Sequence, residues 1–140
     1  MTLPTVLLPL FVEVVLTFVL MLWMGALRGG DFRSGAAKPA DVALREPNWP
    51  RRTMQAANSF SNQFELPVLF YVLTILVWVT RHAGYLFVIL AWLFVICRVL
   101  QAYVHITNNV YRLRSAFYSV GALVLMIMWA IYIVQVLAGT

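Results

Sequence analysis

The chain has 140 residues, of which 63% are hydrophobic and only 11% are charged, and its mean hydropathy is +0.87. Soluble domains average roughly 45–50% apolar and about 25% charged residues, so this composition excludes an ordinary soluble globule and a disordered tail. The single cysteine, Cys97, excludes an intrachain disulfide and a cysteine-cluster metal site. The composition is that of a membrane protein, and the net charge of +5 indicates orientation rather than binding of nucleic acid.

Four apolar segments are long enough to cross a bilayer, which takes roughly 20 residues. They cover about residues 3–27, 53–80, 85–107 and 114–137. The connections 81–84 and 108–113 are short, which is typical of antiparallel neighbours. We therefore predict an all-α integral membrane protein, a single domain over residues 1–140 that forms an up-down bundle of four helices.

The one long connection, residues 28–52, is predicted to be a loop, because glycines and prolines are spread over residues 29–50 and should prevent a helix from continuing. It contains six of the ten basic residues: Arg28, Arg33, Lys38, Arg45, Arg51 and Arg52. Positive residues collect on the cytoplasmic side of membrane proteins. Loops 28–52 and 108–113 are therefore predicted to be cytoplasmic, with both termini on the opposite side.

Polar residues recur along two of the spans with the spacing of one helix face. In the second span the intervals are 4, 3, 4 and 3, through Arg51, Gln55, Asn58, Asn62 and Glu65. In the third span they are 3, 4, 4 and 3, through Arg98, Gln101, His105, Asn109 and Arg112. Because a charged side chain in hydrocarbon costs roughly 2.5–3.5 kcal/mol, each polar face is expected to point into the bundle or a water-filled cavity.

Both polar faces fall in the half of the bundle near loop 28–52, because the second span begins there and the third span ends there. Four residues join them from the start of the fourth span: Arg112, Arg114, Ser115 and Tyr118. We predict a cation-rich cavity that opens toward the cytoplasm and the acyl chains. Glu65 and Arg98 would be its deepest charges, and an ion pair between them would offset the cost of burial.

Pro67 is predicted to lie within the second span. A proline inside a helix removes one backbone hydrogen bond, here that of the Gln63 carbonyl. A membrane helix tolerates this only where neighbouring groups or water satisfy the freed carbonyl. We expect Pro67 to mark the boundary between the polar and apolar halves of this span.

The residues alone leave other interpretations open. The polar faces could form a structural network that joins helices instead of a ligand site. Glu13, in the first span, could approach Arg98 or face another chain. His105 is interpreted as a member of the polar network rather than a metal ligand, and no metal site is predicted. A small transporter is the weakest option, because four spans provide no inverted repeats.

Three features make the sequence similar to the MAPEG family, the membrane-associated proteins in eicosanoid and glutathione metabolism. The segment Asn62-Gln63-Phe64-Glu65-Leu66-Pro67 resembles the Asn-x-x-Glu and proline of the family's second helix. Arg98 lies deep in the third helix. Arg114-Ser115-Ala116-Phe117-Tyr118 resembles the Arg-Ser-x-x-Tyr that begins the fourth helix in the prostaglandin E synthase branch, near the microsomal glutathione transferases.

The resemblance implies a homotrimer in which glutathione, the cosubstrate, binds between neighbouring subunits. The implied activity is a glutathione-dependent transferase or peroxidase that acts on lipophilic small molecules drawn from the membrane lipid. Arg114 and Ser115 would be catalytic, because they would lower the thiol pKa or position the thiolate. The residues predicted to bind glutathione or complete its site are Asn62, Glu65, Arg98, His105, Arg112 and Tyr118.

The sequence departs from the family pattern at several glutathione contacts. Asn58 stands where many members have an arginine four residues before the helix-two asparagine, and Gln101 and His105 replace aromatic or histidine residues of the third helix. The alternative function is that of a noncatalytic binding or scaffold subunit with the same fold, which holds lipid or a partner protein of a larger membrane complex. In that case Glu13 would face the partner.

Overall fold

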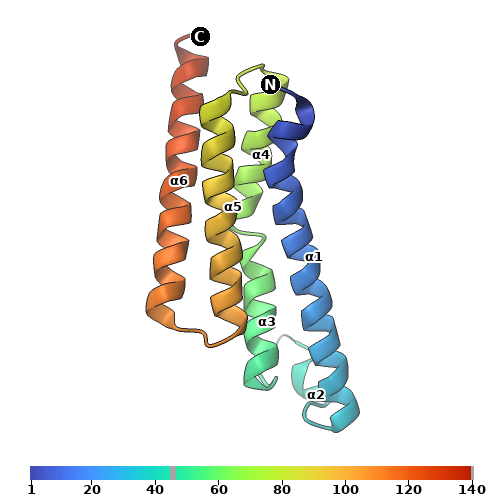
Figure 1. Ribbon diagram of the computed structural model, residues 1–140. Helices are drawn as coiled ribbons and strands as arrows, with labels where there is room; N and C mark the ends of the chain where they lie inside the picture. Colours follow the sequence, from blue (N-terminus) through green and yellow to red (C-terminus); the bar gives the residue numbers. More distant parts are fainter. Residues whose placement is uncertain (45–46, 140) are drawn as a thin grey trace.

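The computed structural model describes residues 1–44 and 47–139, and within these residues it contains helices and turns but no strand. The helices are α1 (Leu3–Ser34), α2 (Pro39–Val42), α3 (Arg51–Asn62), α4 (Leu66–Val79), α5 (Tyr85–Ile106) and α6 (Tyr111–Leu137). Figure 1 shows an antiparallel bundle in which α3 and α4 together form one rod beside α1, α5 and α6. The predicted all-α up-down architecture is confirmed. Arg45, counted above in the basic loop, lies outside the described residues.

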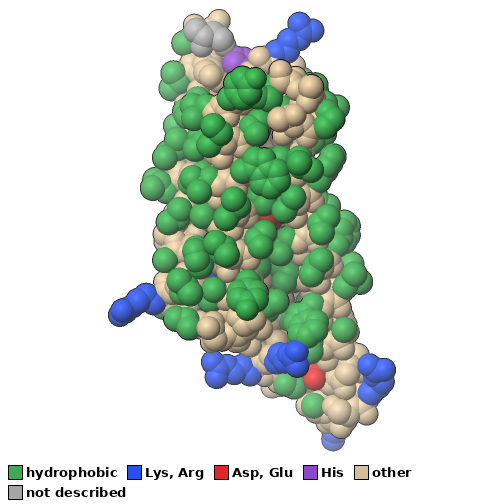
Figure 2. Space-filling model, in the orientation of Figure 1, with side chains coloured by type: hydrophobic (Ala, Val, Ile, Leu, Met, Phe, Trp, Pro, Cys, Tyr) green, Lys and Arg blue, Asp and Glu red, His purple; other side chains and the backbone are tan. Residues whose placement is uncertain are grey.

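The two ends of the bundle differ in charge. Both termini and the α4–α5 connection lie at one end, and the α1–α3 and α5–α6 connections lie at the other (Figure 1). Figure 2 shows most of the visible Lys and Arg side chains at this second end, next to a wide belt of hydrophobic side chains. Four segments are long and apolar enough to cross a membrane: Leu3–Ser34, Arg51–Val79, Tyr85–Ile106 and Tyr111–Leu137.

The first helix is longer than the sequence predicts. α1 continues through Gly29 and Gly30 as far as Ser34, although residues 28–52 were expected to be a loop. This prediction is wrong because a glycine inside a helix costs only about 1 kcal/mol, which contacts elsewhere can offset. The helix ends at Gly35, whose φ of 78° is left-handed and whose N–H donates to the Phe32 carbonyl. The short helix α2 follows inside the predicted loop.

Contacts with α3 hold this extension of α1 in place. The Thr53 hydroxyl donates a hydrogen bond to the Asp31 carboxylate. Arg52, at the start of α3, places its guanidinium 4.7 Å from the centre of the Trp23 ring, an arrangement that attracts a cation to the ring face. The lower part of α1 is therefore tied to α3 by side chains that are far apart in the sequence.

The second span is interrupted where the polar and apolar halves meet. α3 ends at Asn62 and α4 begins at Leu66, so Pro67 lies in the first turn of a new helix and not inside a continuous one. A proline is tolerated there because the first N–H groups of a helix have no intrahelical partner. The turn between the helices is closed by backbone hydrogen bonds, including Gln63 N–H to the Phe60 carbonyl at 3.0 Å. The predicted boundary is in the right place, but it is a break in the helix.

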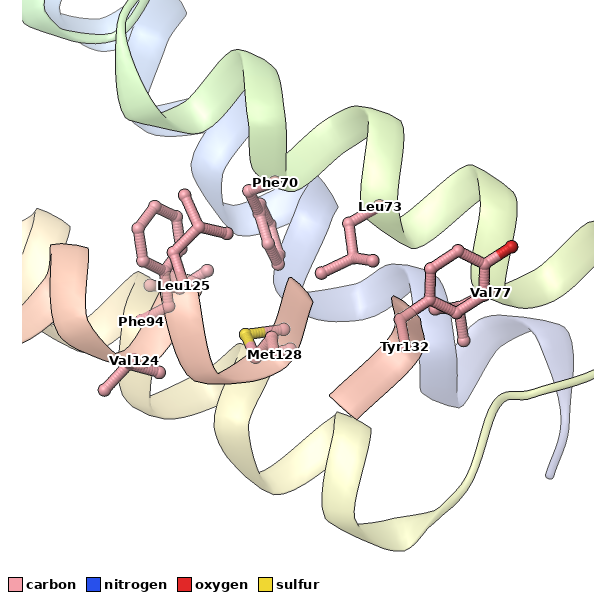
Figure 3. Packing of buried hydrophobic residues seen from close by; sticks show 10 residues of the cluster. Phe70, Leu73, Val77, Phe94, Val124, Leu125, Met128 and Tyr132 are labelled. Carbon is pink, nitrogen blue, oxygen red and sulfur yellow. The ribbon is translucent and has the colours of Figure 1, made fainter. Parts of the chain in front are cut away.

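The apolar core lies between α4, α5 and α6. In Figure 3, Phe70 and Leu73 of α4 point toward Leu125 and Met128 of α6. The ring centres of Phe70 and Phe94 are 4.9 Å apart. α5 and α6 also approach closely beside Gly121, where an added Cβ would lie 3.6 Å from the Cβ of Cys97. This packing aligns the beginning of α6 with the end of α5, and so brings their polar residues together.

Candidate functional site

A polar pocket of about 550 Å³ opens between the α3–α4 break, the end of α5 and the beginning of α6. It lies in the basic half of the bundle, as predicted from the two polar faces. Six of the eight predicted site residues line it: Asn62, Glu65, His105, Arg114, Ser115 and Tyr118. The remaining lining residues are Asn58, Gln101, Tyr111 and Ser119.

α6 contributes one face of its first turns to the pocket. The lining residues are spaced 3, 1, 3 and 1 apart, which places them on one side of a helix: Tyr111, Arg114, Ser115, Tyr118 and Ser119. Arg112 was also predicted to bind the ligand, but it is exposed and does not line the pocket. Two residues along an α-helix correspond to a rotation of about 200°, so Arg112 and Arg114 lie on nearly opposite faces.

Arg114 is held at the edge of the pocket by two neighbours. Its Nη1 donates a hydrogen bond of 2.9 Å to the side-chain oxygen of Asn109, and its guanidinium lies 5.5 Å from the centre of the Tyr111 ring. Asn109 has a φ of 51°, a left-handed conformation that asparagine tolerates better than most residues. A guanidinium has five N–H donors, so a positioned cation with spare donors faces the pocket.

Arg98 lies behind the pocket wall and is only 1% exposed. Its Nη2 donates a hydrogen bond of 3.0 Å to the backbone carbonyl of Asn62, the last residue of α3. Its guanidinium lies 5.9 Å from the centre of the Tyr118 ring. A cation at the carboxyl end of a helix interacts favourably with the helix dipole, so Arg98 stabilises the α3–α4 break. It supports two pocket residues and does not line the pocket itself.

The predicted ion pair between Glu65 and Arg98 is not formed. Glu65 is exposed and lines the pocket, whereas Arg98 is buried behind it. The buried carboxylate on a helix that packs against α5 is that of Glu13, on α1. Glu65 is displaced from the interior because it occupies the turn after α3, where the helix no longer directs its side chain toward α5. Its carboxylate is therefore free to meet a ligand.

Two buried residues of α5 face the pocket with polar atoms that lack a partner. Gln101 and His105 both line it, and within the described residues neither Oε1 of Gln101 nor Nδ1 of His105 has a hydrogen-bond partner. Buried polar groups are nearly always hydrogen-bonded, so these two atoms are unsatisfied polar groups within the pocket wall. The described residues contain no group of three or more His, Cys, Asp or Glu that could hold a metal ion.

Two residues of α6 that line the pocket, Tyr111 and Ser119, were not predicted from the sequence. Tyr111 was not proposed, although it precedes Arg114 by three residues and Ser115 by four, the spacing of one helix face. Ser119 is a small residue four positions after Ser115, a pattern typical of close helix packing, but it lines the pocket. Gly121, two residues later, is where α6 approaches α5.

Comparison with known proteins gives one match. The model of the MAPEG family matches residues 6–134, a range that includes parts of all four membrane-spanning segments and every residue of the pocket. No curated protein and no solved structure matches the chain significantly. The four apolar helical segments and this match identify an integral membrane protein.

Proposed function

Because the chain belongs to the MAPEG family, we propose that it is a glutathione-dependent enzyme that conjugates or reduces lipophilic electrophiles held in the membrane. The observation that carries this proposal is that one polar pocket combines the Glu65 carboxylate and the Arg114 guanidinium. Glutathione carries two carboxylates and one ammonium group, so an anionic and a cationic side chain in one pocket match its charges. Asn62, His105 and Tyr118 add uncharged polar groups around them.

The chemistry assigned to the chain is stabilisation of a thiolate. The thiolate, and not the thiol, is the nucleophile, and a nearby cation favours it. Arg114 would supply that cation and Ser115 a hydroxyl donor, both from the first turns of α6. In conjugation the thiol proton leaves to water and the sulfur forms a bond to an electrophilic carbon of the acceptor. At the same time, either a π bond of the acceptor opens and takes up a proton from water, or a leaving group departs from that carbon as an anion. In reduction of a hydroperoxide the thiolate attacks one peroxide oxygen, the O–O bond breaks and the other oxygen leaves as an alcohol after protonation. A second glutathione then displaces water from the sulfenic acid to give glutathione disulfide. The pocket lies beside helices with exposed apolar faces, a route by which a lipophilic acceptor would arrive from the bilayer.

We also propose that the protein is a homotrimer with the pocket closed by a neighbouring subunit. Native mass spectrometry of the detergent-solubilised protein tests this together with the ligand. A trimer that retains glutathione is the expected result. A monomer contradicts the assembly, and co-purification with a larger complex without retained glutathione favours the noncatalytic subunit.

Titration of the purified protein with glutathione tests the function directly. We expect saturable binding and growth of the thiolate absorbance as the sites fill, because Arg114 is held beside the pocket. Absence of saturable binding contradicts the proposed function. Saturable binding without a thiolate signal or turnover of any electrophile points to a binding subunit.

The sidedness of the loops is a further part of the proposal. The basic end of the bundle faces the cytoplasm, and the termini face the opposite side. The only cysteine is buried, so single added cysteines can be labelled against a low background. In intact cells, a membrane-impermeant maleimide is expected to label Gly139→Cys but not Lys38→Cys, since both positions are exposed in the fold. Labelling of Lys38→Cys but not of Gly139→Cys would show that the protein has the opposite orientation in the membrane.

A further inference from the structure

Glu13 is a carboxylate buried in the middle of a membrane-spanning helix. It is 0% exposed, and neither carboxylate oxygen has a hydrogen-bond partner within the described residues. The nearby Thr17 hydroxyl donates to the backbone carbonyl of Glu13 and not to its carboxylate. Because Glu13 is enclosed by its own chain, it does not present a surface to a partner protein, one of the two interpretations that the sequence left open.

Arg98 is a buried cation that also lacks hydrogen-bond partners for part of its guanidinium. One nitrogen is bonded to the Asn62 carbonyl, but its Nε and Nη1 have no partner within the described residues. α1, which carries Glu13, packs against α5, which carries Arg98. Among the described residues, Glu13 and Arg98 are the only Asp, Glu, Lys or Arg side chains that are buried. Each has charged-group atoms without a hydrogen-bond partner, and the two helices that carry them are in contact.

An ionised side chain without a partner is costly in the membrane interior. A buried ion that loses its partner is strongly destabilising, whereas replacing both members of a pair is often neutral. The electrostatic interaction between Glu13 and Arg98 acts through a protein interior that screens it far less than water does. We therefore propose that Glu13 is the counter-ion of Arg98 and, through it, a positioning residue for the pocket.

The route from Glu13 to the pocket passes through two contacts of Arg98. The guanidinium holds the Asn62 carbonyl at the end of α3 and lies against the Tyr118 ring of α6. Both Asn62 and Tyr118 line the pocket. A charge on α1 that holds the Arg98 guanidinium in place therefore fixes the position of the α3–α4 break relative to α6. Glu65 projects from this break. Glu13 takes part without contacting any ligand.

Two variants at position 13 separate charge from shape. Glu13→Gln keeps the shape and removes the charge, whereas Glu13→Asp keeps the charge and shortens the side chain. For a counter-ion, Glu13→Gln is expected to weaken glutathione binding about tenfold, the change that corresponds to 1.4 kcal/mol, and to lower the thermal midpoint. Glu13→Asp should restore most of both. A side chain that only fills space gives the reverse order, and that order, or two variants that both match the wild type, overturns the proposal.

A double-mutant cycle in thermal midpoint tests the pairing itself. We expect Glu13→Leu/Arg98→Leu to be more stable than either single variant, because the double variant leaves no uncompensated charge. The matched control is Glu65→Leu/Arg98→Leu, whose coupling should be much smaller, since Glu65 is exposed and water screens its charge. Additive effects in the Glu13 cycle, or coupling only in the Glu65 cycle, overturn the assignment.

The glutathione measurement rests on the proposed function, but the midpoints do not. If the wild-type protein binds no glutathione, the proposed function fails while the midpoints of the position-13 variants and of the cycle still decide the role of Glu13. If glutathione binds and the Glu13 cycle is additive, only the assignment of Glu13 fails.

Discussion

Replacing Arg114 by alanine is expected to weaken glutathione binding about 10- to 100-fold and to abolish the thiolate absorbance of the bound ligand. Hydrogen bonds to charged groups contribute roughly 1.5–3 kcal/mol each, and tenfold in affinity corresponds to about 1.4 kcal/mol. Arg114 is positioned by Asn109 and Tyr111 before any ligand arrives. The variant therefore loses an interaction whose geometry is already prepared. Calorimetric titration and difference absorbance measure the two effects.

Two further variants show whether the effect of Arg114 is specific. Arg81→Ala removes the same charge at the opposite end of the bundle, where Arg81 is exposed between α4 and α5, and it should bind glutathione like the wild type. Arg114→Lys should recover only part of the affinity, because an ammonium lacks the planar fork of a guanidinium. Equal losses in Arg114→Ala and Arg81→Ala would show that net charge, and not the pocket, governs binding.

Replacing Glu65 by glutamine is expected to weaken glutathione binding about tenfold, through loss of a charge-assisted contact with the ligand's ammonium group. The effect is smaller than that of Arg114→Ala because Glu65 is exposed and water screens its charge. A matched ligand isolates this contact. Glutaryl-cysteinylglycine lacks only the amino group, so its affinity should be the same for the wild type and Glu65→Gln. Isothermal titration of each of the two ligands into each of the two proteins gives the four affinities that this comparison needs.

The carboxylate control for this experiment is Asp41→Asn. Asp41 is exposed on α2, outside the pocket, so its replacement changes the net charge equally without touching the site. If glutathione and glutaryl-cysteinylglycine lose the same affinity in Glu65→Gln, then Glu65 does not bind the ammonium group. The ligand would then lie in the pocket in a different orientation.

The pocket could be predicted from the sequence because the residues that line it recur with the period of a helix. The spacing of Asn58, Asn62, Gln101 and His105 placed them on two helix faces, and the order of the spans placed both faces in one half of the bundle. Arg114, Ser115 and Tyr118 were recognised by a motif. Arg112 was included because it lies at the end of the polar face of the third span, two residues before Arg114, but it is exposed and does not line the pocket.

The predictions that were wrong concern features that depend on the backbone conformation or on a residue far away in the sequence. Gly29 and Gly30 predicted a loop, but contacts between α1 and α3 keep them helical. Pro67 was placed inside a helix, but the chain breaks before it and turns Glu65 out to the pocket. That break is also why Glu65 does not pair with Arg98. The counter-ion that we propose for Arg98, Glu13, is on α1, whose depth and rotation relative to α5 cannot be read from the local sequence pattern.

By itself, the sequence of this protein determined the properties that depend on the local order and spacing of residues. These are the four membrane-spanning segments, the end of the bundle where basic residues gather, and the polar side of each helix. The hydropathy of a segment shows whether it can span a membrane, and the helix period of 3.6 residues shows which side chains share one face. Only the tertiary structure decided which groups meet across helices, including the Arg98 guanidinium with the Asn62 carbonyl, and which charged side chains are buried, namely Glu13 and Arg98. The physical reason is that such contacts depend on the relative depth and rotation of packed helices, which are set by the summed packing of all of them.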